Sequence, residues 1–108
     1  MTAAIQRNYA PSVVQVEGEM TIYRAAELKE SLITSIEEST VIEFDLSRVT
    51  ALDSAGVQIL MLARRTAQAR HSELRLVAHS PAVLDVMELL NLGAYFDQAR
   101  VITAVKAQ

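Results

Sequence analysis

Hydrophobic and polar positions first form a pattern in two short stretches near the N-terminus. Residues 5–9 alternate as in a short strand that Ala10-Pro11 ends. Residues 13–16, which read Val-Val-Gln-Val, form a second apolar run closed by Glu17-Gly18. Because the two stretches are so close in sequence, they predict a β-hairpin.

A helical spacing of three and four residues follows the predicted hairpin. Thr21 is a plausible N-cap, and the charged residues after it fall mostly between the apolar ones. The pattern predicts an amphipathic helix that Ser39-Thr40 ends, with apolar positions Ala25, Leu28, Leu32 and Ile36. Residues 41–46 then carry apolar side chains on both faces, as a central strand covered on at least one side requires.

A polar corner, Asp53-Ser54-Ala55-Gly56, separates that strand from the most apolar helix of the chain. Residues 57–63 are apolar nearly all round, which predicts that the first half of this helix is deeply packed. The helix becomes polar at Arg64-Arg65, and Arg70 and His71 lie toward its C-terminal end, where cations complement the helix dipole. We interpret these cations as structural.

The last third of the chain repeats the alternation of strand and helix. Residues 74–78 favour a strand, and Ser80-Pro81 is a strong helix start because serine can cap and proline loses no hydrogen bond there. Gly93 is placed to end this helix in a left-handed conformation, and residues 101–105 favour a last strand or edge segment. The buried face of the helix is predicted to hold Val83, Val86, Met87 and Leu90.

The predicted order is strand, strand, helix, strand, helix, strand, helix, strand. Strand–helix–strand connections are nearly always right-handed and lead to parallel neighbours. We therefore expect an α/β fold built as a single domain over residues 1–108, with a mixed sheet that includes the N-terminal hairpin.

Composition then narrows the classes of function. Hydrophobic residues make up 51% of the chain and charged residues 21%, an ordinary globular balance, and the net charge of −3 offers no basic surface to a nucleic acid. The absence of cysteine excludes disulfides and cysteine-ligated zinc, and His71 and His79 lack the acidic spacing of a metal site. No apolar run approaches the ~20 residues of a membrane span. We expect a cytoplasmic protein without cofactor, metal or membrane insertion.

A serine beside an aspartate at the corner allows several chemical interpretations. A nucleophilic serine needs a base and an oxyanion site, but Gly-x-Ser-x-Gly is absent and no motif ties a histidine to Ser54. A phosphoryl-accepting receiver domain would use Asp53 together with an acidic pair near the N-terminus, which is missing. Two interpretations remain. The pair is an ordinary N-cap, or Ser54 receives a phosphate where the helix dipole favours negative charge. For Gly56 we expect tight packing.

Residues 41–60, which read VIEFDLSRVTALDSAGVQIL, closely resemble the central motif of the STAS domain, a family named for sulfate transporters and anti-sigma-factor antagonists. The resemblance runs nearly end to end. Residues 16–20 are similar to the family's segment before its first helix, and residues 83–96 to its last helix and the turn after it. The resemblance implies a small mixed sheet with helices mainly on one side and a binding function rather than catalysis.

In the anti-sigma-factor-antagonist branch, the residue after the motif's aspartate is the serine or threonine that the partner kinase phosphorylates. The resemblance therefore implies phosphorylation of Ser54. Thr21 stands where the family commonly has an acidic residue. Ala55 stands where a second hydroxyl is often found, so the chain offers no second acceptor there.

The function that the resemblance implies is partner switching. The unphosphorylated protein would bind an anti-sigma factor or related serine protein kinase, phosphorylation of Ser54 would release it, and a protein phosphatase would reset Ser54. The alternatives are an accessory STAS subunit that binds the ATPase of a bacterial lipid-transport system, and a STAS module of a chemosensory pathway.

The surface that would meet this partner is predicted around the corner. Ile22 and Val57 lie in this region but could equally belong to the core, whereas Tyr23 can bury its ring and keep its hydroxyl in water. The predicted partner-binding residues are Met20, Thr21, Tyr23, Ser47, Asp53, Ser54, Ala55 and Val57.

Overall fold

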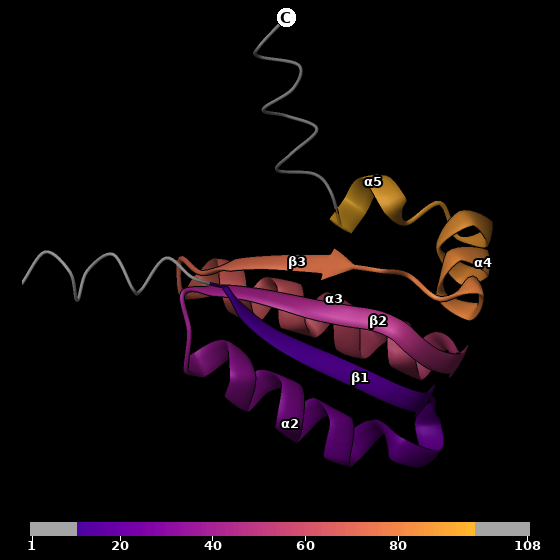
Figure 1. The fold of residues 1–108 in the computed structure, drawn as a ribbon, viewed down its shortest axis with the longest axis horizontal. Helices are drawn as coiled ribbons and strands as arrows, with labels where there is room; N and C mark the ends of the chain where they lie inside the picture. Colours follow the sequence, from indigo (N-terminus) through magenta and orange to yellow (C-terminus); the bar gives the residue numbers. More distant parts are fainter. Residues whose placement is uncertain (1–10, 97–108) are drawn as a thin grey trace, which may run out of the picture.

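A three-stranded parallel sheet lies at the centre of the computed structural model, which describes residues 11–96 (Figure 1). Its strands are β1 (Ser12–Met20), β2 (Val41–Leu52) and β3 (Glu73–Val77), and β2 lies between the other two. The α/β class is thus confirmed. The predicted strands at residues 5–9 and 101–105 lie outside the described residues, and so does the hairpin that would make the sheet mixed.

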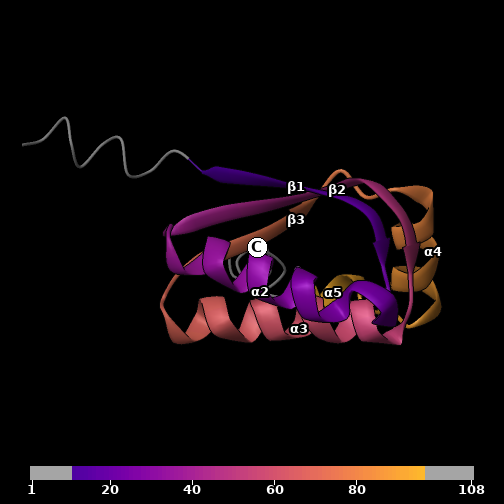
Figure 2. The same ribbon diagram turned by 90° about the horizontal axis from the view of Figure 1, so that it is seen from below.

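The two long helices pack against the same face of this sheet (Figure 2). They are α2 (Ala25–Glu37) and α3 (Ser54–Ala69), which lie side by side. The shorter α4 (Pro81–Leu89) lies at the end of the sheet where the strands finish, and α5 (Gly93–Phe96) follows it. The opposite face of the described sheet carries polar side chains. Among them are Glu43 and Arg75, whose Oε2 and Nη1 atoms form an ion pair at 3.2 Å.

The core lies between the covered face and the two long helices. Ile42, Phe44 and Leu46 alternate along β2 and are fully buried, as a strand with one covered face requires. The predicted helix positions Leu28, Leu32 and Ile36 are buried as well. On α3 the buried residues form one face rather than the whole circumference, because Met61 and Leu62 keep part of their surface.

The N-terminal strand continues past the glycine that was predicted to close it. Gly18 takes a left-handed φ of 82° at an irregularity in the β1–β2 pairing, and the pairing resumes until Met20 lies beside Leu52. Glycine therefore bends this strand instead of ending it.

The prediction that Thr21 caps the first long helix is wrong. Its hydroxyl donates to Glu19 Oε1 at 3.2 Å, and it precedes a 3₁₀ turn, η1 (Ile22–Arg24), rather than α2. The amphipathic helix begins only at Ala25, so residues 22 and 23 precede it and belong to η1.

The start of α4 is as predicted, but its end is not. Ser80 accepts a hydrogen bond from the Val83 N–H at 3.2 Å, with Pro81 as the first helical residue. The left-handed residue after the helix is Asn91, with a φ of 56°, whereas Gly93 begins α5. Asparagine can serve in this position, because its side chain tolerates left-handed geometry. Leu90, predicted to be buried, ends the helix 50% exposed.

Two of the four cations interpreted as structural, Arg64 and Arg70, make contacts that agree with this interpretation. Arg70 Nη2 donates to the Glu37 carbonyl oxygen at 3.1 Å and so joins the ends of α3 and α2. The Arg64 guanidinium lies 4.4 Å from the centre of the Tyr95 ring, which holds α5 against α3.

Candidate functional site

The candidate site lies where β1 and β2 end side by side. Parallel strands carry their C-terminal ends to the same edge of a sheet, and here Met20 lies beside Leu52. The Asp53 N–H donates to the Met20 carbonyl oxygen at 3.3 Å, so the segments that leave the two strands start from a shared hydrogen bond. One segment forms η1 and the other forms the first turn of α3.

The Asp53 carboxylate joins these two segments. Its Oδ1 accepts from the Gly56 N–H at 3.0 Å, and its Oδ2 accepts from the Ile22 N–H at 3.1 Å. These two donors, Gly56 first, hold the pKa of the Asp53 carboxyl below its ordinary value of 3.8, because both stabilise the charged form. The N-cap interpretation is therefore correct for Asp53, and this residue also positions η1.

Ser54 is the first residue of α3, and its side chain is exposed. Within residues 11–96 its hydroxyl makes no hydrogen bond, since the capping contact is made by Asp53 instead. An exposed hydroxyl that plays no part in the helix cap is accessible to a modifying enzyme. The phosphorylation of Ser54 itself stays a prediction.

Gly56 allows the close approach of the two segments. A Cβ atom at this position would lie 2.1 Å from the Met20 carbonyl oxygen and 2.6 Å from Leu52 Cδ1. No other residue fits without displacing the backbone, which confirms the predicted packing role of Gly56.

Two exposed apolar side chains lie on η1, the turn that Asp53 holds against the start of α3. Ile22 is 67% exposed and Tyr23 is 89% exposed, so the interpretation of Ile22 as a core residue is wrong. Because Asp53 binds the Ile22 N–H, the position of η1 is tied to the start of α3. We call Ile22, Tyr23, Asp53 and Ser54 the corner surface.

Three predicted partner-binding residues lie beneath the corner surface. Met20 is fully buried, Val57 is 5% exposed and Thr21 is 9% exposed, so their side chains support the corner rather than contact a partner. Met20 and Val57 point into the core because apolar side chains at a strand end and on the inner face of α3 are removed from water there. Ala55 is half-buried at the edge of the surface.

Ser47 is exposed but lies far back along β2. It lies five positions before Leu52, about 16 Å away at ~3.3 Å per residue. Its N–H donates to Asp45 Oδ1 at 2.9 Å, and the adjacent Leu46 carbonyl accepts from the Ser80 N–H at the start of α4. The structure therefore does not bring Ser47 to the corner, because the end of β2 extends well past it.

Arg24 is a residue of the site that the sequence pattern does not indicate. Its Nη1 donates to the carbonyl oxygens of Glu17 and Glu19 at 2.7 and 2.9 Å, and its Nε pairs with Glu27 at 3.0 Å. These bonds fix the course of the chain from β1 into η1. An arginine at the start of a helix carries no sequence signal for such a role.

Residues 11–96 present no group of three histidine, aspartate and glutamate side chains that could hold a metal ion. No helix in the same part of the chain is long and apolar enough to cross a membrane.

Comparison with known proteins gives a family match and named relatives. Residues 3–102 match the family model described as "Mlab, STAS domain". An anti-sigma-B factor antagonist of Listeria monocytogenes serovar 1/2a is 32% identical over 79 residues, which cover 72% of this chain and 69% of the relative. An anti-sigma-B factor antagonist of Listeria innocua serovar 6a matches to the same extent.

Solved structures share the fold. An anti-sigma factor antagonist from Mycobacterium paratuberculosis superposes with a TM-score of 0.73 at 26% identity, covering 91% of this chain and 87% of that one. The anti-sigma factor antagonist SpoIIAA in its unphosphorylated form gives 0.65 at 22% identity, with coverages of 91% and 90%. The phosphorylated form of SpoIIAA, a Bacillus cell fate determinant, gives 0.59 at 24% identity over 77% of each chain.

Proposed function

Because the chain belongs to the STAS domain family, we propose that it is a partner-switching regulator controlled at Ser54. In the unphosphorylated state the corner surface binds an anti-sigma factor or a related serine protein kinase. Phosphorylation of Ser54 by such a kinase releases the partner, and a phosphatase restores binding. The observation that carries this proposal is that Asp53 caps α3, so the neighbouring Ser54 is exposed and plays no part in the cap.

The unmodified corner surface is suited to bind a protein. Tyr23 and Ile22 offer exposed apolar area on a short turn whose backbone is held by Asp53, so little freedom is lost on binding. Aromatic side chains are enriched where binding energy is concentrated. Ser54 follows Asp53, which binds the Ile22 N–H, so a partner bound over η1 would also cover the Ser54 hydroxyl.

Phosphorylation would change the charge of the corner more than its backbone. A phosphate adds about −1.5 to −2 charges, and they would lie next to the Asp53 carboxylate. The Gly56 N–H already donates a hydrogen bond to Asp53, so it is not available to stabilise the phosphate. The phosphate is tolerated while it faces water, whereas a partner packed over it must desolvate two neighbouring anions. Each 1.4 kcal/mol of this penalty weakens binding tenfold.

The relatives support this proposal at the level of the family branch. Those named above are anti-sigma factor antagonists, and SpoIIAA is known in both an unphosphorylated and a phosphorylated form. Carried over to this chain, the name implies an anti-sigma factor as partner, and the position of Ser54 supplies the acceptor.

The test is an affinity pull-down from the source cells with the wild type, Ser54→Ala and Ser54→Glu, followed by mass spectrometry. We expect the wild type and Ser54→Ala to recover the same kinase-like protein and Ser54→Glu to recover at least about tenfold less. Ser31→Ala and Ser31→Glu are the matched controls, because Ser31 is an exposed serine on α2 away from the corner. Equal recovery by all variants refutes the switch.

A second candidate keeps the corner surface but not the switch. The matching family model is described as "Mlab, STAS domain" rather than by the relatives' name, which favours a stand-alone STAS subunit of another branch. Such a subunit would bind the ATPase of a bacterial lipid-transport system through Tyr23 and Ser54. Recovery of a transporter ATPase in the same pull-down, with Ser54 unmodified in cells, selects this candidate.

A further inference from the structure

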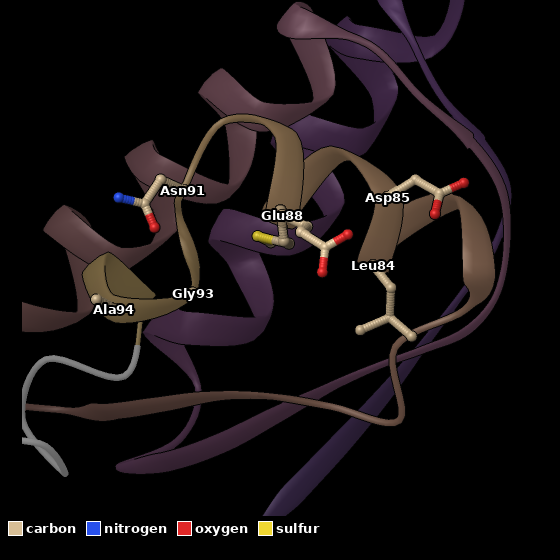
Figure 3. A pocket seen from close by; sticks show the side chains of 7 residues that line it. Leu84, Asp85, Glu88, Asn91, Gly93 and Ala94 are labelled. Atoms are coloured by element: carbon tan, nitrogen blue, oxygen red, sulfur yellow. The ribbon is translucent and has the colours of Figure 1, made fainter.

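A second surface lies on α4, and its residues differ from those of the corner surface. Residues of α4 and of the chain after Asn91 line a shallow, open hollow of about 550 Å³ (Figure 3). This volume is within the range of sites that bind side chains or small ligands. The residues that line the hollow are Leu84, Asp85, Met87, Glu88, Asn91, Gly93 and Ala94.

The outer face of α4 carries large apolar side chains in water. α4 has nine residues, and two of them are largely exposed leucines: Leu84 is 54% exposed and Leu89 is 82% exposed. At 100° per residue these two leucines flank Asp85 and Glu88 on one side of the helix, while Val83 and Met87 face the core. Exposed apolar area that adjoins a hollow is typical of an interaction site.

The charge of this surface has one sign. Residues 81–94 contain Asp85 and Glu88 but no lysine or arginine. Neither carboxylate takes part in an ion pair within the part of the chain that the structure describes. The C-terminal end of α4 adds the negative end of the helix dipole. A ligand that fits here presents apolar groups together with positive charge.

We propose that this hollow binds an amphipathic helix of a partner protein, in which leucine-like side chains are flanked by arginine or lysine. α4 is about 13 Å long, at ~1.5 Å per residue, which matches two to three turns of a docked helix. Apolar side chains spaced four residues apart on that helix would contact Leu84 and enter the hollow, and the cations would meet Asp85 and Glu88. The surface shares no residue with the corner, so its partner can bind whether or not Ser54 is modified.

Gly93 offers a substitution that alters the lining of the hollow without a steric clash at Cβ. A Cβ atom at this position meets no atom within 4 Å, and Gly93 is not among the residues with positive φ. Because Gly93 lines the hollow, Gly93→Leu adds a large side chain to its lining. This variant tests occupancy of the hollow separately from its charge.

The experiment measures binding of a synthetic helical peptide to the full chain by fluorescence anisotropy. The probe carries leucine on one face and lysine on both flanks in an alanine background, and a second peptide has each lysine replaced by glutamate. We expect the lysine peptide to bind at least about tenfold more tightly than the glutamate peptide. Gly93→Leu and the pair Asp85→Lys/Glu88→Lys should each weaken binding by a similar factor. Backbone amide shifts in NMR spectra should change at residues 84–94.

Glu37→Lys/Glu38→Lys is the matched control, because it alters net charge equally on the exposed end of α2. An equal loss in this control, amide shifts away from α4, or no binding at all overturns the proposal. Concentration-dependent self-association in sedimentation that Leu84→Asp abolishes also overturns it, because the occupant would then be a second copy. Ser54→Glu should leave peptide binding unchanged, so failure of the switch and failure of this proposal are distinguishable.

Discussion

One carboxylate at the corner, that of Asp53, accepts hydrogen bonds from backbone N–H groups of two different segments. Asp53 accepts from Gly56 in α3 and from Ile22 in η1, and these bonds tie η1 to the first turn of α3. An N-cap needs only the first of these bonds. The second makes Asp53 a positioning residue for the corner surface, which distinguishes it from Ser80, the ordinary cap of α4.

Asp53→Asn separates the two contacts. An amide has one acceptor oxygen, so it can keep the bond from the Gly56 N–H but presents an NH₂ group to the Ile22 N–H. We expect amide hydrogen exchange to become at least several-fold faster at Ile22 and to change little at Gly56. Asp45→Asn is the control, because Asp45 bonds to Ser47 in mid-strand. Unchanged protection at Ile22 would show that η1 is held by other contacts.

The charge of Asp53 also has a consequence for stability at low pH. The pKa of its carboxyl lies below 3.8 in the folded protein, with the Gly56 N–H as the largest cause. A depressed pKa means that the folded state binds fewer protons than the unfolded state, so the contribution is complete above the unfolded pKa. It is lost as the pH falls through the folded pKa. Urea unfolding from about pH 7 to about pH 3 should therefore show a shallower loss of stability for Asp53→Asn than for the wild type.

Site residues could be predicted from the sequence where their chemical type differs from that of their neighbours. They could not be predicted where their role depends on which side chains the fold exposes. The Asp53-Ser54 pair stands out in sequence because polar residues interrupt an apolar stretch. The exposure of Ile22 and the burial of Met20 depend on where β1 ends and η1 begins. Hydrophobicity alone does not distinguish these two side chains, because both are apolar and lie two residues apart.

At the scale of elements, Gly56 sets how closely η1 approaches α3. Gly56→Ala would place a Cβ atom 2.1 Å from the Met20 carbonyl oxygen, so the two segments must separate. We expect a loss of about 1–3 kcal/mol in the free energy of unfolding, measured with urea. Gly93→Ala is the control, because its Cβ meets nothing, and it should leave stability unchanged or slightly raised. An equal effect of both substitutions would argue against the close approach.

The start of α4 depends on a buried serine. Ser80 is 5% exposed and its hydroxyl oxygen accepts from the Val83 N–H, which lacks a partner within the helix. Ser80→Ala should lower the free energy of unfolding by about 1 kcal/mol and increase hydrogen exchange at Val83. Ser31→Ala, at an exposed position on α2, should change it by less than about 0.5 kcal/mol.

Two of the three predicted helix starts were placed correctly, whereas Thr21 precedes η1 and does not cap α2. Ser80-Pro81 and the Asp53-Ser54 corner combine a side-chain acceptor with the following apolar run, and both were placed correctly. The end of α4 was assigned to Gly93, but Asn91 takes the left-handed conformation and the N–H of Leu92 donates to the Met87 carbonyl oxygen at 2.8 Å. Asparagine and glycine compete for that role, and their order in sequence does not decide which residue takes it.

The whole molecule is a sheet whose described strands have one face packed against helices. The α/β class and the helical layer follow from the spacing of apolar residues, and the parallel order follows from the helices that connect the strands. The extent of β1 and β2 does not follow from spacing, because Gly18 in β1 and the polar residues Ser47, Arg48 and Thr50 in β2 lie inside strands that continue. Both strands end at the corner, so their full length is what brings η1 and α3 together.

Two valines of β1 test the difference between the faces of the sheet. Val16 is 4% exposed in the core, whereas Val13, on the same strand, is 62% exposed. Each substitution to alanine removes two methyl groups, so the two variants differ only in where the groups are lost. Val16→Ala should cost about 2 kcal/mol, because buried methyl groups are lost and a cavity remains. Val13→Ala should change stability by less than about 0.5 kcal/mol, as surface substitutions usually do. Urea unfolding at constant m-value measures both, and equal losses would show that the outer face of β1 is covered as well.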